Sequence, residues 1–312
     1  MPIDLSIQLG PLALKNPVLV AAGTFGYGIE FQEFFDLRQL GALITKTITL
    51  QPRLGNPAPR LVETPAGMLN AVGLQNIGVE EFFSAKWPAL RALGAPVILS
   101  IAGFTLEEFG ALASRAAGTG IAALELNLSC PNVAHAAPGS KSGQRCFAQS
   151  AEETASAVRT VKGAADVPVF AKLSAEVSDL AAVARAAVEA GADGLTLINT
   201  IAGMVIDSDR EAPALANRTG GLSGPAIRPI AVRCVWEARQ AVRVPIIGVG
   251  GVASGRDALE MILAGASAIQ VGTANFWNPR APLVILKELG ALVGQKKRPL
   301  RELIGAVRAA PA

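Results

Sequence analysis

The fold is decided by a strand–helix–strand unit, VPVFAKLSAEVSDLAAVARAAVEAGADGLTLINTI, which occupies residues 167–201. The unit opens with the short apolar run 167–174 and closes with a second one, 194–201. Between them, the apolar residues of DLAAVARAAVEAGA (179–192) recur at helical spacing. Near-continuous apolar strands on both sides of an amphipathic helix are typical of a parallel sheet that is covered by helices.

The same alternation of apolar runs and helix-like segments extends along the chain. Six further runs are expected to be core strands: PVLVAAG (17–23), ALITKTIT (42–49), PVILSIAG (96–103), AALELNLSC (122–130), VPIIGVGG (244–251) and AIQVGTA (268–274). Eight strand–helix units indicate an α/β fold that closes into a (β/α)8, or TIM, barrel. We expect residues 1–312 to form one such domain, with residues 5–17 as a hairpin that turns at Gly10-Pro11 and plugs the bottom of the barrel.

Composition narrows the class of protein. Hydrophobic residues make up 51% of the 312 residues and charged residues 17%, which supports a large buried core. The net charge of +3 is small and the basic residues are spread along the chain, so nucleic acid is not expected as a partner. No apolar run reaches the roughly 18 residues of a membrane span, and the N-terminus does not resemble a signal peptide. A cytoplasmic protein without a membrane segment is the simplest interpretation.

Two of the expected strand-to-helix connections are unusually long. One covers about residues 50–78 and is rich in Pro and Gly, and the other covers about residues 131–151. Long loops in compact domains usually serve as lids or binding loops. Because both follow the C-terminal ends of strands, where TIM barrels hold their active sites, we expect the functional site there.

Glycines and lysines at these strand ends suggest an anionic ligand. Gly250-Gly251 and Gly272-Thr273 end the seventh and eighth strands, whose loops commonly form a phosphate site, although tight turns alone would also explain them. Lys46 and Lys172 lie within apolar runs, where a lysine is costly unless it meets an anion. The alternatives are a lysine that reaches the rim of the barrel or one that pairs with an acid such as Glu125.

Asparagines form the next group: Asn70, Asn127, Asn132 and Asn199. An asparagine amide offers donors and an acceptor, which suits a cyclic imide or amide ring. Turn formation is the alternative role for Asn70 and Asn132 on the loops, and it applies less well to Asn127 and Asn199 on strands.

Cys130 ends the fourth strand and is the candidate base. A free thiol has a reference pKa of about 8.5, so modest activation makes it a base near neutral pH. An inert buried thiol is the alternative, and it describes Cys234 better than Cys130. Cys146 is interpreted as incidental, and His135, the only histidine, as a solvated loop residue rather than the partner of a nucleophilic Cys130. The three cysteines show no metal-ligand spacing, so no metal site is expected.

Together, these motifs resemble the dihydroorotate dehydrogenases of the soluble class 1 type over essentially the whole chain. The resemblance is carried by VAAGTFGYG (20–28), ITKTIT (44–49), NAVGLQNIG (70–78), ELNLSCPNV (125–133), FAKLS (170–174), LINT (197–200), TGGLSGPAIRPIA (219–231), IIGVGGV (246–252) and IQVGTA (269–274). The combination is highly specific, although no single motif is. The 70–76 motif and the overall spacing look closest to the class 1B catalytic subunit.

The resemblance implies an FMN-dependent enzyme that oxidises dihydroorotate to orotate in de novo pyrimidine biosynthesis. Cys130 would take the C5 proton while hydride passes from C6 to N5 of FMN. Substrate contacts are implied for Lys46, Asn70, Ala71, Val72, Gly73, Leu74, Asn127, Asn132, Asn199 and Thr200. FMN contacts are implied for Ala22, Gly23, Lys46, Thr47, Ser100, Asn127, Lys172, Ile198, Gly224, Gly250, Gly251, Gly272 and Thr273.

Class 1B also implies a partner subunit, which carries FAD and an iron–sulfur cluster and passes electrons to NAD. The chain would then form a homodimer or a heterotetramer with that subunit. The alternatives are a class 1A-like homodimer that reduces fumarate, or a related FMN barrel that acts on another dihydropyrimidine or on RNA dihydrouridine. Two departures stand out: the 131–151 loop, which is normally Gly-rich in the family, is longer here and carries an extra Cys, and Ser100 replaces a frequent Asn.

Overall fold

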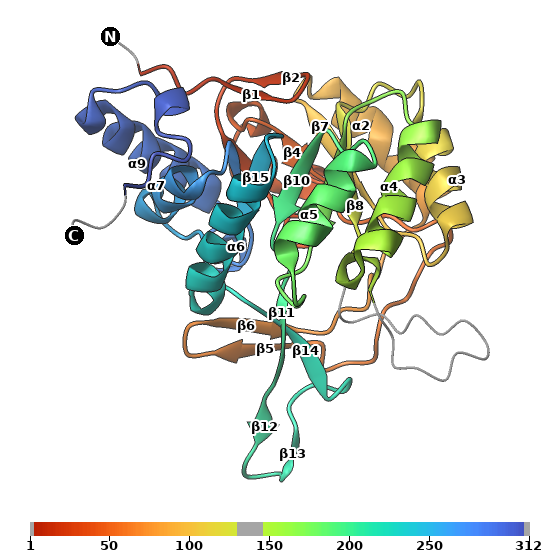
Figure 1. Ribbon diagram of the computed structural model, residues 1–312. Coiled ribbons are helices and arrows are strands. Elements are labelled where there is room, and N and C mark those ends of the chain that lie inside the picture. Colours follow the sequence, from red (N-terminus) through yellow and green to blue (C-terminus); the bar gives the residue numbers. More distant parts are fainter. Residues whose placement is uncertain (1–2, 130–145, 309–312) are drawn as a thin grey trace.

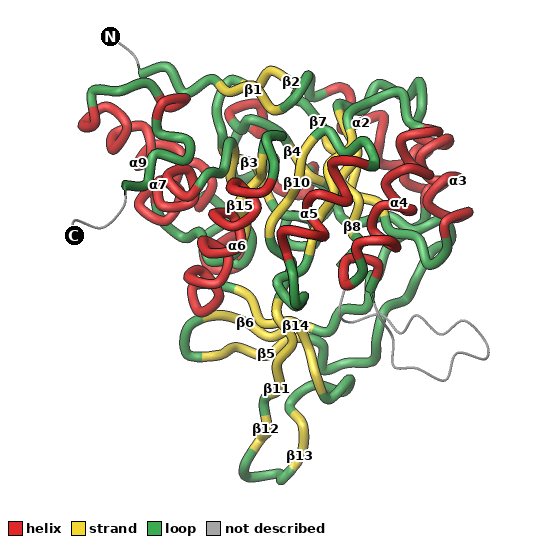
Figure 2. Tube along the Cα trace, in the orientation of Figure 1, coloured by secondary structure: helices red, strands yellow, loops and turns green. Residues whose placement is uncertain are grey.

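The computed structural model describes residues 3–129 and 146–308, which form a barrel of parallel strands inside a layer of helices (Figures 1 and 2). The strands follow one another in the order β3 (Val18–Val20), β16 (Ala268–Val271), β15 (Ile246–Val249), β10 (Gly194–Leu197), β9 (Val169–Leu173), β8 (Ala123–Asn127), β7 (Val97–Ile101) and β4 (Leu43–Ile44). Leu19 and Ala42 form a parallel bridge between the first and last of these strands. The sheet therefore closes, and the predicted (β/α)8 fold is confirmed.

Helices connect the strands and cover the outside of the barrel. Their bounds are α1 (Val79–Glu81), α2 (Trp87–Ala92), α3 (Leu106–Ala116), α4 (Ala151–Ala164), α5 (Leu180–Glu189), α6 (Arg228–Ala241), α7 (Gly255–Ala264), α8 (Ala274–Trp277) and α9 (Ala281–Lys296). Side chains of Thr105, Ser150, Asp179 and Ser254 cap the first turns of α3, α4, α5 and α7, each accepting a hydrogen bond from a backbone N–H. Within the described ranges, no helix has the length and apolarity needed to cross a membrane.

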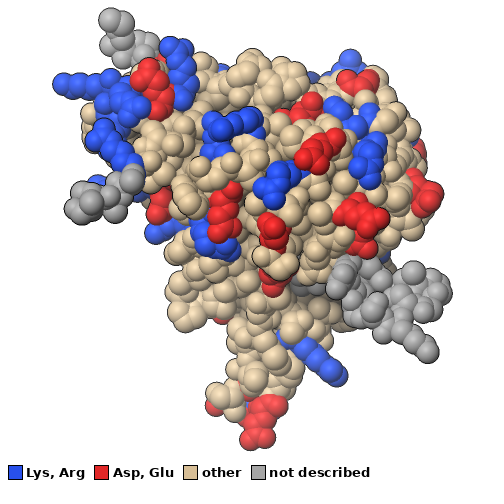
Figure 3. Space-filling model, viewed as in Figure 1, with Lys and Arg blue, Asp and Glu red and all other residues tan. Residues whose placement is uncertain are grey.

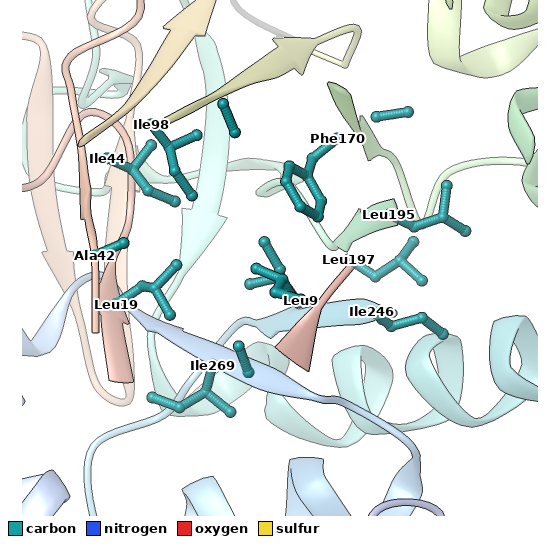
Figure 4. Close-up of a cluster of buried hydrophobic side chains, with 14 of the residues drawn as sticks. Leu9, Leu19, Ala42, Ile44, Ile98, Phe170, Leu195, Leu197, Ile246 and Ile269 are labelled. Carbon is teal, nitrogen blue, oxygen red and sulfur yellow. The ribbon is translucent and has the colours of Figure 1, made fainter. Parts of the chain in front are cut away.

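The predicted N-terminal hairpin closes the bottom of the barrel. It consists of β1 (Ile7–Leu9) and β2 (Leu12–Leu14), and Leu9 is fully buried among side chains from the barrel strands (Figure 4). At the turn, a Cβ atom on Gly10 would lie 3.4 Å from the carbonyl oxygen of Asp193, directly before β10. The hairpin therefore lies at the N-terminal ends of the strands, which confirms the expected plug.

A second sheet covers the opposite end of the barrel. Its strands are antiparallel and follow the order β11 (Ile201–Met204), β14 (Thr219–Ser223), β6 (Gly67–Asn70) and β5 (Leu61–Thr64). Beyond it, the hairpin of β12 (Ile206–Asp207) and β13 (Ala212–Pro213) projects away from the barrel (Figure 1). We refer to the four-stranded sheet as the roof.

The barrel strands are shorter than the runs expected from the sequence, and two of these differences concern the site. The run 42–49 pairs as a strand only at Leu43–Ile44, and after it only Ile48 bridges β7, at Ile101. The run 194–201 ends as a barrel strand at Leu197, and Ile201 already belongs to the roof. In both places the chain leaves the barrel ladder because it turns into a long excursion that helps to build the roof.

Candidate active site

A cavity of about 310 Å³ lies at the C-terminal ends of the barrel strands, beneath the roof. It brings together most of the residues singled out from the sequence: Ala22, Gly23, Lys46, Thr47, Asn70, Val72, Gly73, Leu74, Asn127, Lys172, Ile198, Asn199, Thr200, Gly224, Gly250, Gly251, Gly272 and Thr273. These residues come from the barrel strands, the roof and the loops that follow β3, β4, β10, β15 and β16. The structure therefore gathers these residues at the end of the barrel where the site was predicted.

Two of the predicted residues that the structure describes, Ala71 and Ser100, do not line this cavity. Ala71 is buried in a small cluster with Leu69 and Leu215, because its side chain packs into the roof. Ser100 is fully buried, and its hydroxyl group lies 2.9 Å from the Thr47 hydroxyl group. Ser100 therefore supports a residue of the lining instead of forming the lining itself. Cys130 and Asn132, like most of the 131–151 loop, lie outside the described residues.

Glycines form one end of the cavity. Gly250 and Gly251 follow β15 with φ angles of 129° and 74°, which favour glycine. A Cβ atom on Gly251 would lie 2.8 Å from the Gly224 carbonyl oxygen, so a side chain there would collide with the chain that leads into α6. At Gly272 the space is open, since a Cβ atom would meet only Ala21, at 3.6 Å. A backbone without side chains next to the start of a helix suits a phosphate group. We refer to Gly224, Gly250, Gly251 and Gly272 as the glycine cradle.

Amide side chains form the floor of the cavity. Asn199 donates hydrogen bonds to Asn127 Oδ1 at 3.2 Å and to the backbone oxygen of Ser129 at 3.0 Å. Asn127 in turn donates to Thr47 Oγ1 at 3.3 Å. These contacts hold the ends of β8 and β10 and the chain after β4 in one arrangement. Both asparagines were predicted, whereas the anchoring role of Ser129 was not.

The two lysines lie in different surroundings. Lys172 is only 5% exposed, and its Nζ atom lies 3.7 Å from Glu125 Oε1. The pairing with Glu125, an alternative considered from the sequence, is therefore present, although Lys172 also lines the cavity. Lys46 Nζ would lie 3.8 Å from a Cβ atom on Gly23, and Lys46 also borders a neighbouring hollow lined by Tyr27 and Arg53.

Roof residues complete the lining and were largely missed from the sequence. Asn70 was predicted, and its side chain donates to the Gly221 carbonyl oxygen at 3.1 Å, across the roof. Ser223 was not, yet its hydroxyl group joins Met68 of the roof to Thr273, which donates to it at 2.8 Å. One signal was available, because LVETPAGMLN (61–70) has two apolar runs around a Pro-Ala turn. Other unpredicted lining residues are Thr24, Leu61, Phe276 and Trp277.

The two cysteines that the structure describes, Cys146 and Cys234, do not line the cavity. Cys234 is fully buried on α6, and burial raises the pKa of its thiol to about 11. Cys146 is also buried, before α4. Among residues 3–129 and 146–308, no three His, Cys, Asp or Glu side chains are grouped so that they could hold a metal ion.

The cavity thus combines glycines, an amide floor and two lysines at the C-terminal ends of the barrel strands. These features are typical of the class of barrel enzymes that bind a phosphate-bearing cofactor next to a polar ring. The family model described as "Dihydroorotate dehydrogenase" matches residues 4–293, so the chain belongs to the dihydroorotate dehydrogenase family, whose members are flavin-dependent oxidoreductases. The resemblance found in the motifs is confirmed.

Similar proteins include three described as "Dihydroorotate dehydrogenase B (NAD(+)), catalytic subunit". The protein of Desulforudis audaxviator is 51% identical over 308 residues, which cover 98% of each chain. Those of Citrifermentans bemidjiense and Geobacter sulfurreducens are each 48% identical over 306 residues, or 97% of this chain and 98% of theirs. These names agree with the class 1B resemblance.

Proposed function

We propose that this chain is the catalytic subunit of a class 1B dihydroorotate dehydrogenase, which oxidises dihydroorotate to orotate in pyrimidine biosynthesis in the cytoplasm. The observation that carries the proposal is the Asn199–Asn127–Thr47 chain of hydrogen bonds on the floor of a cavity that also holds Lys46 and the glycine cradle. The family and the names of the relatives support the same reaction.

The cavity fits FMN. Its phosphate group would lie at Gly224, Gly250, Gly251, Gly272 and Thr273, where side chains are absent or small and a phosphate group could approach the backbone. The ring would lie against Ala22, Gly23, Thr47, Asn127, Lys172 and Ile198. When bound, FMN supplies the acceptor for the hydride of the substrate. We assign Ser100 to the support of Thr47, because it lies behind that residue.

The proposed substrate, dihydroorotate, is a ring that contains amide groups and carries a carboxylate. The Asn127 and Asn199 side chains are already oriented by their mutual hydrogen bond, so they present fixed donors and acceptors to such a ring. Lys46 would pair with the carboxylate, while Asn70, Val72, Gly73, Leu74 and Thr200 surround the ring. Asn132 is proposed as a further contact on the basis of the family motif alone.

Cys130 is proposed as the base that takes the C5 proton. It follows Ser129 in the sequence, and Ser129 is fixed by Asn199 and by its own hydrogen bond to the Lys172 carbonyl oxygen at 3.3 Å. Loss of the C5 proton and of a hydride from C6 leaves the ring double bond of orotate, so the two hydrogens and two electrons are accounted for.

The electrons are proposed to reach NAD through a partner subunit that carries FAD and an iron–sulfur cluster. The words "catalytic subunit" in the names of the relatives support such a partner. We expect a homodimer of this chain that binds two copies of the partner. A fumarate-reducing homodimer of the class 1A kind is the competing assembly.

The test is to purify the chain alone and together with the candidate partner. Bound FMN and reduction of that FMN by dihydroorotate are expected from the chain alone, and NAD reduction only from the complex. Cys130→Ala should keep its FMN but lose dihydroorotate oxidation at neutral pH, whereas the matched variant Cys146→Ala should remain active. Turnover of fumarate by the chain alone, or normal activity of Cys130→Ala, would contradict the proposal.

A further inference from the structure

The interior of the barrel holds a buried carboxylate, that of Glu125 on β8, one layer below the cavity floor. Its side chain has no exposed surface, and Asn127, two residues later on the same strand, lines the cavity. Glu125 Oε2 accepts hydrogen bonds from Thr196 of β10 at 3.1 Å and from Gln270 of β16 at 2.6 Å. The carboxylate is therefore held from two other strands of the barrel.

The other carboxylate oxygen faces a single cation. Glu125 Oε1 accepts no hydrogen bond from any described residue, and the Nζ atom of Lys172 lies 3.7 Å from it. Lys172 is itself 5% exposed and borders the cavity. An isolated buried carboxylate is strongly disfavoured, so this ion pair is the arrangement that makes Glu125 tolerable in the barrel. One member of the pair faces the cofactor site, and the other lies behind it.

We infer that Glu125 is a positioning residue, which sets how much positive charge Lys172 presents to the flavin. The inference rests on the proposed function. With its carboxylate in place, the pair is neutral overall, and the field of the ammonium group in the cavity is partly cancelled. Reduced flavin carries more negative charge than oxidised flavin, so charge close to the ring changes the balance between the two forms. Glu125 thereby favours the oxidised form.

The variant Glu125→Gln removes the charge of the side chain but keeps its size and shape. Its amide oxygen can keep the hydrogen bonds from Thr196 and Gln270, while the neutral amide group leaves Lys172 without its counter-charge. The matched control is Thr196→Val, which removes one hydrogen bond from the same carboxylate but keeps the charge. If Glu125 served only to pack the barrel, the two variants would have similar effects.

The experiment measures the two-electron midpoint potential of FMN bound to the purified chain. In Glu125→Gln, the affinity for reduced FMN relative to that for oxidised FMN should be about tenfold higher than in the unaltered chain. This change raises the midpoint potential by about 30 mV. Thr196→Val should leave the potential unchanged. An unchanged or lowered potential in Glu125→Gln, or an equal shift in both variants, would overturn the inference.

A measurement on flavin-free protein covers the case in which Glu125→Gln does not retain FMN. Lys172→Met leaves Glu125 as an unpaired buried charge, so the double variant Lys172→Met/Glu125→Gln should unfold at a higher temperature than Lys172→Met alone. An equal or lower unfolding temperature would refute the coupling. If the unaltered chain bound no FMN or did not oxidise dihydroorotate, the proposed function would fail instead.

Discussion

Asn199 donates a hydrogen bond from its side-chain amide to the side-chain oxygen of Asn127, and the two atoms are 3.2 Å apart. The same amide group also reaches the backbone oxygen of Ser129. One side chain therefore fixes the ends of two barrel strands and orients the second asparagine of the floor. A substrate ring bound as proposed would meet polar groups that need no further ordering, which is the arrangement that favours catalysis.

Removal of this amide group should be costly for the reaction. In Asn199→Ala, Asn127 loses the donor to its Oδ1 atom and the floor loses an amide group, so we expect kcat/KM for dihydroorotate to fall about 100-fold. Steady-state kinetics on the FMN-loaded chain measure the effect. Asn217→Ala is the control, because Asn217 is exposed and, among the described residues, its side chain bonds only to the Thr219 carbonyl oxygen. Equal kinetics in both variants would remove Asn199 from the substrate site.

Lys46 should contribute mainly to the binding of the substrate carboxylate. A hydrogen bond to a charged group is worth about 1.5–3 kcal/mol, so Lys46→Ala should raise KM for dihydroorotate by about 10- to 100-fold. The control is Lys86→Ala, whose ammonium group lies 3.5 Å from Glu30 and away from the cavity lining. An unchanged KM in Lys46→Ala would mean that the carboxylate lies elsewhere.

Gly251 should be required for the cofactor cradle itself and not only for its backbone conformation. Gly251 and Gly118 have similar positive φ angles, 74° and 69°, but only at Gly251 would a Cβ atom meet other atoms within 4 Å. Gly118→Ala should therefore lose about 1–2 kcal/mol of stability and keep its FMN affinity. Gly251→Ala should bind FMN at least about tenfold more weakly as well, as an FMN titration of flavin-free protein would measure. Equal affinities in the two variants would contradict this role.

The buried thiol of Cys234 predicts a pH dependence of stability. Burial raises its pKa from 9.0 to about 11 in the folded chain. The neutral thiol therefore stabilises the fold fully below pH 9.0, and this contribution is lost as the pH rises towards 11. Denaturant unfolding should show a decline of stability between pH 8.5 and 10.5 that is smaller in Cys234→Ala by on the order of 1 kcal/mol. Parallel pH profiles in the two proteins would show that Cys234 does not titrate in this range.

The barrel could be predicted from the sequence because its strands are buried on both faces. The run 96–103, for example, contains the observed strand Val97–Ile101, all of whose residues are buried. Strand ends were overestimated where the chain leaves the ladder, as after Ile44 and Leu197. At these two places the sequence keeps the apolar pattern of a strand, but the chain turns and places side chains in the cavity. Most of the predicted site residues do line one cavity, while their individual roles stay predictions.

The roof as a whole could not be predicted, because its strands are short and its two halves pair across a long stretch of sequence. Asn70 pairs with Gly221, which lies 151 positions later, and no local pattern specifies that register. The same limit applies to Glu125. Its place in the sequence shows a charge in an apolar strand, but only the closed barrel brings Gln270 and Thr196 to it. On the outer face of the molecule, by contrast, acidic and basic side chains are interspersed over the helical layer (Figure 3).

The roof also has a consequence for how this barrel can be redesigned. Its middle pair joins Leu69 to Leu222, so one half comes from the excursion after β4 and the other from the excursion after β10. A chimera that exchanged only one excursion with another barrel would leave the other half with an open strand edge over the cavity. A redesign of the residues above the cavity would therefore have to graft both segments together.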